Sequence, residues 1–168
     1  MRKRIDEANI YVETSLTGPG KRDGWYAAVI RCQTSKGIAE KGFVRMEKET
    51  TWYRSVLLAV IGALKMMKPG RVRIYTNCFH VKNIYGRNLM GEWKQNGWKK
   101  ATGEEIKNKE LWQQFFEEII RMGGTDKIEF RFSKHNDCRD FLLGLIAEKK
   151  EEYEKQSRGE GENLDFTK

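Results

Sequence analysis

Residues 93–112 read WKQNGWKKATGEEIKNKELW, and this stretch decides the interpretation of the whole chain. Its aromatic and basic side chains interleave around a glycine: Trp93, Lys94, Trp98, Lys99 and Lys100. Cations beside flat rings suit a phosphate backbone and its bases. Asn108 then precedes an apolar stripe at 111–120 with helical spacing, closed by Gly123 and Gly124. A basic loop that could contact nucleic acid therefore leads into a helix, which Asn108 is predicted to cap.

On either side of this stretch, some segments have apolar residues at every second position, as in a strand, and others have them at every third or fourth position, as in a helix. The predicted elements are strands at 9–15, 25–32, 38–46, 72–76 and 128–132, and helices at 51–67, 79–85, 108–122 and 137–153. Three successive strands joined by turns predict an antiparallel meander, and the later alternation predicts parallel pairing. The pattern therefore predicts an α/β fold with a five-stranded mixed sheet, three antiparallel strands first, and helices on both faces.

Length and charge set the outer bounds. The chain has 168 residues and a net charge of +8, of which residues 1–147 carry +10, so a polyanionic partner is favoured. We expect a basic extension at 1–7, one domain at 8–155 and a charged, disordered tail at 156–168. No apolar run is long enough for a membrane, and the basic N-terminus lacks the pattern of a secretory leader, so a cytoplasmic protein with free thiols is expected.

The chain resembles type 1 ribonuclease H over nearly all of residues 8–150. Residues 93–100 match the family's W-K-x-x-G-W-K protrusion, which grips the DNA strand of an RNA–DNA hybrid, and residues 106–112 match V-K-N-x-D-L-W. Residues 10–15, 74–77 and 136–140 resemble the segments T-D-G-S, T-D-S and N-E-R-C-D with their flanking positions. The resemblance implies the ribonuclease H fold and hydrolysis of the RNA strand by two Mg²⁺ ions that four carboxylates hold.

The resemblance also implies a divergent member with a degraded active site. The four acids fall on Glu13, Val56, Asn77 and Asp140, so two carboxylates of four remain. Glu13 adds one methylene to the family's Asp, a displacement of about 1 Å that is costly in catalysis. The expectation is a domain that requires no cofactor, with Glu13 and Asp140 as a weak Mg²⁺ or Mn²⁺ site at best.

The position that reads ribose also differs from the family. An Asn pair there contacts the 2′-hydroxyls of the RNA strand, and Trp52 and Tyr53 replace it. Hybrid specificity is thereby put in doubt. Two roles stay open for these rings: a hydrophobic staple for the helix that follows, or stacking on bases.

A zinc site is a further alternative. Cys78, His80, His135 and Cys138 flank the former active site in this fold, and two Cys with two His can hold Zn²⁺ tetrahedrally. Buried packing of the cysteines as small apolar residues is the competing interpretation.

Three functions stay open at this point. The first is a nucleic-acid-binding domain, for RNA–DNA hybrid or duplex, with impaired catalysis through Glu13, Asn77 and Asp140. The second is a weakly active, metal-dependent ribonuclease H that cleaves the RNA strand of hybrids. The third is a protein-interaction module on a vestigial ribonuclease H fold.

Overall fold

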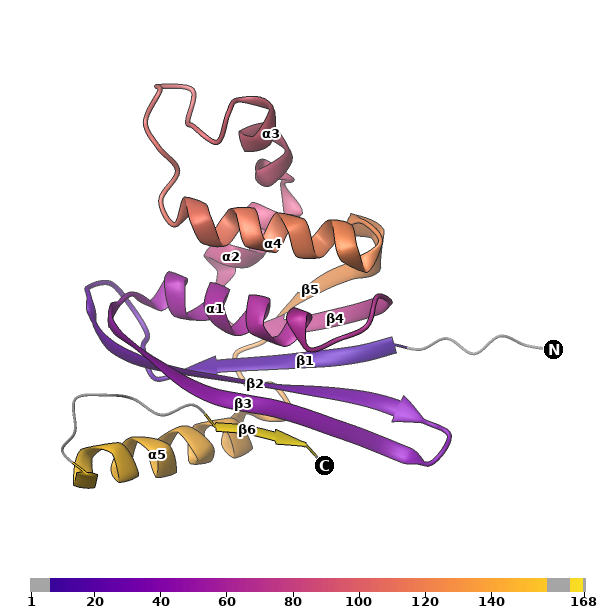
Figure 1. Ribbon diagram of the computed structural model, residues 1–168, viewed down its shortest axis with the longest axis vertical. Helices are drawn as coiled ribbons and strands as arrows, with labels where there is room; N and C mark the ends of the chain where they lie inside the picture. Colours follow the sequence, from indigo (N-terminus) through magenta and orange to yellow (C-terminus); the bar gives the residue numbers. More distant parts are fainter. Residues whose placement is uncertain (1–6, 157–163, 168) are drawn as a thin grey trace.

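The computed structural model describes residues 7–156 and 164–167 (Figure 1). The elements follow one another in this order: β1 (Glu7–Thr14), β2 (Arg22–Thr34), β3 (Gly37–Thr50), α1 (Trp52–Lys65), β4 (Arg71–Thr76), α2 (Phe79–Gly86), α3 (Leu89–Gln95), α4 (Lys109–Met122), the 3₁₀ helix η1 (Thr125–Lys127), β5 (Ile128–Phe132), α5 (Arg139–Gln156) and β6 (Leu164–Thr167).

The strands form one mixed sheet in the order β5-β4-β1-β2-β3-β6. β1, β2, β3 and β6 pair antiparallel, whereas β4 runs parallel to both β1 and β5. The predicted antiparallel meander, the mixed sheet and the later parallel pairs are therefore confirmed.

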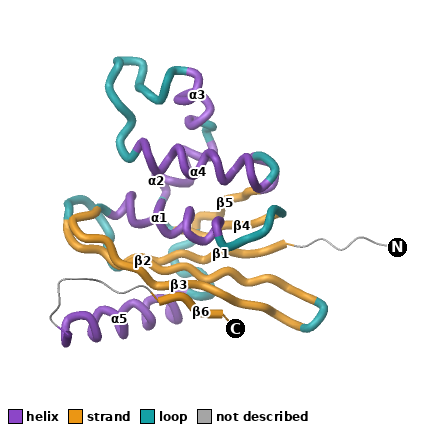
Figure 2. The backbone as a smooth tube through the Cα atoms, in the orientation of Figure 1, coloured by secondary structure: helices purple, strands orange, loops and turns teal. Residues whose placement is uncertain are grey.

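Helices cover both faces of the sheet, as Figure 2 shows. Along β1, Ile10 and Val12 belong to the larger core, which α1, α2 and α4 complete, whereas Tyr11 belongs to a smaller core under α5. This division follows from the strand period, because successive side chains point to opposite faces. The two cores hold the strand ends in place from both sides.

The residues that precede α1 and α4 differ in how they cap their helices. Thr51 caps α1, since its Oγ1 accepts a hydrogen bond from the backbone N–H of Arg54 at 3.3 Å. Asn108 occupies the N-cap position of α4 as predicted, but with a φ of 61° its side chain makes no capping hydrogen bond. Its Oδ1 instead accepts a hydrogen bond from Nη1 of Arg54 at 3.3 Å, which joins the starts of α1 and α4.

The predicted count of five strands is wrong, because a sixth strand forms inside the segment that was expected to be a disordered tail. β6 pairs antiparallel with β3, with Gly42 opposite Phe166. The ring of Phe166 packs edge-on against Phe141 of α5, at 5.9 Å between centroids. An otherwise exposed strand edge and an aromatic ring on the neighbouring helix thus stabilise a strand too short to stand out in a charged sequence. Glu7, the last residue of the expected extension, begins β1, whereas residues 1–6, 157–163 and 168 lie outside the described residues.

Among the residues that the structure describes, no helix is long and apolar enough to cross a membrane.

Candidate functional site

The site forms where the parallel strands end. The last residues that pair between β1 and β4 are Tyr11 and Tyr75. Glu13 and Asn77 each lie two residues further along their strands, so they reach the same edge of the sheet. Open α/β sheets bind ligands outside the carboxyl ends of their strands, and this edge is therefore the candidate site.

Glu13 is a buried carboxylate with two partners from the segment that opens α5. Only 4% of the residue is exposed. Nδ2 of Asn136 donates a hydrogen bond to Oε2 of Glu13 at 3.1 Å, and Nε of Arg139 lies 4.0 Å from the same oxygen. Burial raises the pKa of Glu13 to about 7, against the opposing effects of Arg139 and Asn136.

The contact between Asn136 and Glu13 is built into the backbone. Oδ1 of Asn136 accepts a hydrogen bond from the backbone N–H of Cys138 at 2.8 Å. This bond turns the amide so that its NH₂ group faces Glu13. The turn before α5 therefore supplies both a neutral donor and, one residue after Cys138, a guanidinium to the Glu13 carboxylate.

The other three positions do not supply a matching set of ligands. Val56 is 1% exposed and packs in the larger core of α1, so it offers an apolar surface only. Asn77 is half-buried and neutral, and Asp140 is exposed on the first turn of α5. Within residues 7–156 and 164–167, no three His, Cys, Asp or Glu side chains come together as a metal site. These residues do not fit a pair of Mg²⁺ ions, which require several convergent oxygen ligands.

The predicted zinc cluster is also wrong for the described residues. Cys78 lies in the larger core and Cys138 in the smaller core, so the sheet separates their thiols. His80 stacks on Tyr53, with 4.0 Å between ring centroids and 14° between planes, and His135 is exposed. The competing interpretation, in which the cysteines pack as small apolar residues, is the one that holds.

The basic loop has an aromatic support. Trp93, at the end of α3, packs edge-on against Trp112 of α4 at 5.7 Å, and Trp98 packs edge-on against Phe116 at 5.9 Å. Asn96 closes the turn, since its Nδ2 donates to the carbonyl of Lys99 at 2.9 Å. Both tryptophans are half-buried and hold the loop on α4, which leaves the lysines exposed: Lys94, Lys99 and Lys100.

Trp52 and Tyr53 stand at the root of this loop. Their rings lie 5.6 Å apart at 35°, and Tyr53 is the partner of His80. The next residue, Arg54, donates from Nη1 to Glu110 at 2.6 Å, which ties the start of α1 to the start of α4. Sequence reasoning missed His80 as an aromatic partner, and it missed Asn136 and Arg139 as partners of Glu13.

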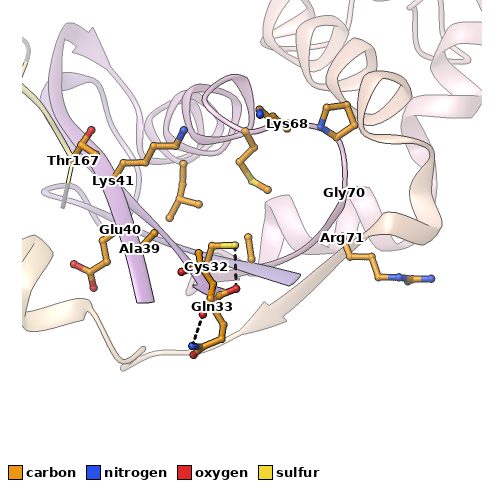
Figure 3. Close-up of a pocket in the computed structure, with 14 residues that line it drawn as sticks. Cys32, Gln33, Ala39, Glu40, Lys41, Lys68, Gly70, Arg71 and Thr167 are labelled. Atoms are coloured by element: carbon orange, nitrogen blue, oxygen red, sulfur yellow. Dashed lines mark hydrogen bonds between the residues drawn. The ribbon is translucent and has the colours of Figure 1, made fainter. Parts of the chain in front are cut away.

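A pocket of about 580 Å³ lies at the other end of the sheet (Figure 3). Ala8 at the start of β1, Cys32 near the end of β2 and the 67–71 segment after α1 line it. Its lining is largely apolar and contains none of the predicted site residues. We therefore place the candidate site at the Glu13 edge and not in this pocket.

Comparison with known proteins shows the family of this chain. A family model described as RNase H matches residues 6–128. The ribonuclease H of Caldicellulosiruptor saccharolyticus is 41% identical over 159 residues, covering 86% of this chain and 99% of the relative. The ribonuclease H of Acetivibrio thermocellus is 36% identical over 135 residues, covering 79% and 86%.

A solved structure supports the fold alone. LC9-RNase H1, described as a type 1 RNase H with the type 2 active-site motif, is 20% identical with a TM-score of 0.69, and the match covers 99% of this chain and 80% of that chain. The sequence matches and the mixed sheet agree: this chain belongs to the ribonuclease H family and has the fold of its type 1 members.

Proposed function

We propose that the protein binds RNA–DNA hybrid or duplex nucleic acid and cleaves it poorly or not at all. The observation that carries the proposal is the state of Glu13: its buried carboxylate contacts the amide of Asn136 and the guanidinium of Arg139. In this arrangement a side-chain cation of the protein lies beside the carboxylate that would otherwise face a divalent ion.

Binding is supported by the basic loop and by the relatives. Lys94, Lys99 and Lys100 are exposed on a loop that tryptophans hold against α4. The net charge of +8 favours a polyanion. The relatives are named ribonuclease H, and an RNA–DNA hybrid or duplex is the ligand class that such a loop suits.

Impaired catalysis is supported by the ligand set. A two-metal mechanism needs carboxylates that converge on both ions, and here Val56 has no oxygen in its side chain and Asn77 has no charge. A Glu13 with its pKa near 7 is partly protonated at neutral pH, which further weakens it as a ligand for a hard cation.

The binding test uses RNA–DNA hybrid, duplex DNA and duplex RNA across a range of salt concentrations. Replacing Lys94, Lys99 and Lys100 together with Ala should lower affinity and reduce the slope of log K against log salt by up to about three. The control replaces Lys36, Lys68 and Lys150 together with Ala, which removes the same charge. Affinity and the salt slope should change much less in this variant, because these exposed lysines lie away from the loop. Negligible affinity at low salt, or equal effects of the two triples, contradicts the proposal.

A weakly active, metal-dependent ribonuclease is the second candidate, which the names of the relatives favour. A hybrid-cleavage assay with Mg²⁺ and with Mn²⁺ separates it from the first. Cleavage by the natural protein that Asp140→Asn abolishes would establish the second candidate. Equal traces of cleavage in both proteins would indicate a contaminating nuclease.

A further inference from the structure

Exposed aromatic rings gather beside the candidate site, on elements that the basic loop does not include. We define the aromatic patch as Tyr53 at the start of α1, Phe79 and His80 at the start of α2, and Phe132 at the end of β5. Tyr53 is 39% exposed, Phe79 60% and Phe132 43%. Large apolar side chains left open to water in one place mark an interaction surface more often than a packing accident.

The rings are ordered by contacts with one another. Tyr53 and His80 are stacked, with centroids 4.0 Å apart, and Trp52 lies tilted against Tyr53 at 5.6 Å. Phe79 meets Phe132 edge to face at 6.2 Å. A stacked pair whose outer member is exposed presents a preformed flat surface, so binding another ring there costs little ordering.

The charge around the patch favours a nucleic acid over an apolar protein segment. Nζ of Lys82 lies 5.9 Å from the centroid of Phe79. Partial burial, and to a smaller extent the charge of Lys107, lower the pKa of His80 below its ordinary value, so its ring is neutral at neutral pH. Cations at the rim with rings at the centre match a strand whose phosphates flank its bases.

The patch is connected to the basic loop. Arg54, next to Tyr53, binds Asn108 and Glu110 at the point where that loop ends in α4. A duplex that Lys94, Lys99 and Lys100 contact therefore comes near the patch at one end of its bound length. The bases inside a duplex are already stacked and paired, so an unpaired base offers these rings a free face that an internal base pair does not.

From this geometry we infer that the aromatic patch stacks unpaired bases, so that the preferred ligand is a duplex with a single-stranded extension. The inference rests on the proposed function, because it takes the basic loop to hold the duplex part. It adds a ligand class, partly single-stranded nucleic acid, and it assigns His80, Phe79 and Phe132 to its recognition.

The test compares a blunt duplex with the same duplex that carries a short dT extension containing one 2-aminopurine. The natural protein should bind the extended duplex more tightly and should quench the 2-aminopurine when the base stacks. His80→Ala should lower affinity for the extended duplex about 5- to 100-fold and abolish the quenching, while the affinity for the blunt duplex stays the same. Melting temperatures of all variants verify that they are folded.

Two matched variants make the test specific. His80→Phe keeps a flat ring without a titratable group and should retain both affinity and quenching. Ile120→Ala removes an exposed apolar side chain of α4, 62% exposed and outside the patch, and should change neither.

The outcomes separate this inference from the proposed function. Equal affinity for the two ligands, or unchanged quenching in His80→Ala, overturns the inference. The proposed function still stands in that case as long as the protein binds the blunt duplex. If the natural protein fails to bind the blunt duplex but binds single strands in a His80-dependent way, the proposed function and the preference for an extended duplex are both overturned, and only base stacking by the patch is supported. If substitutions in the aromatic patch change only the binding of a protein partner, the inference is overturned.

Discussion

At the scale of single residues, Glu13 has an unusual proton affinity. Its pKa is about 7 in the folded protein against an ordinary value of 4.5, so the folded state holds the proton more tightly than the unfolded state. The contribution of Glu13 to stability is therefore complete below pH 4.5 and is lost as the pH rises through about 7.

Glu13→Gln tests this directly, because glutamine keeps the shape without the charge. At pH 8 the variant should be more stable than the natural protein by about 1–3 kcal/mol, and at pH 4 the difference should nearly vanish. Urea unfolding at both pH values measures it. Glu148→Gln, on the exposed surface of α5, serves as the control. A Glu13→Gln protein that is destabilised at pH 8 but not at pH 4 would instead show that Arg139 needs the negative charge.

Restoring the family's acids should cost stability. With Glu13→Asp, Val56→Glu and Asn77→Asp combined, several carboxylates meet at one strand edge, and one of them replaces a buried valine. Without metal the reconstruction should be less stable than the natural protein by about 1–3 kcal/mol. Thermal melts with EDTA and with Mg²⁺ should show a larger rise with Mg²⁺ for the reconstruction. A natural protein whose melting temperature rises strongly with Mg²⁺ would contradict the proposed loss of catalysis.

At the scale of elements, the pairing of β3 depends on Gly42. A Cβ at this position would lie 2.2 Å from the carbonyl oxygen of Ala28 and 2.7 Å from the ring of Phe166. The first of these atoms is backbone and cannot rotate away, so a larger residue must move β2 or β3. The close approach of three strands thus requires glycine here.

Gly42→Ala should therefore destabilise the protein by about 1–3 kcal/mol, the usual scale of overpacking. Gly144→Ala is the matched control, because nothing lies within 4 Å of its added Cβ on the helix α5. That change should stabilise the helix by up to about 1 kcal/mol. Chemical unfolding of both variants gives the comparison, and equal effects would mean that the strands adapt.

The elements also show where sequence reasoning succeeded. Long segments with a regular apolar period, such as α1 and α4, were predicted because their own residues decide their structure. The prediction omitted α3, whose seven residues include a glycine and are too few to repeat an apolar period. It also omitted β6, since this strand depends on the edge of β3 and on Phe141, which only the folded chain brings near.

At the scale of the whole molecule, the sequence was enough to predict which residues belong to the candidate site. It was not enough to predict which side chains these residues contact. The resemblance to the family identified Glu13, Val56, Asn77 and Asp140 as the positions of its four acids. The partner of Glu13, however, is Asn136, which is 123 positions away in the chain. Neither that bond nor the stacking of His80 on Tyr53 has a local signal, because both arise from segments that the fold brings together.

The separation of Cys78 and Cys138 by the sheet has a practical consequence. Burial raises the pKa of both thiols, whereas Cys32 is half-buried at the pocket of Figure 3. In the native protein a maleimide should therefore modify Cys32 first, which attaches one fluorophore far from the aromatic patch. Cys78 and Cys138 should be modified more slowly, because the chain must open before the maleimide reaches them. Cys78 then reports on opening of the larger core and Cys138 on opening of the smaller core. Counting labels over time by mass spectrometry would thus measure whether the two layers come apart together or in succession.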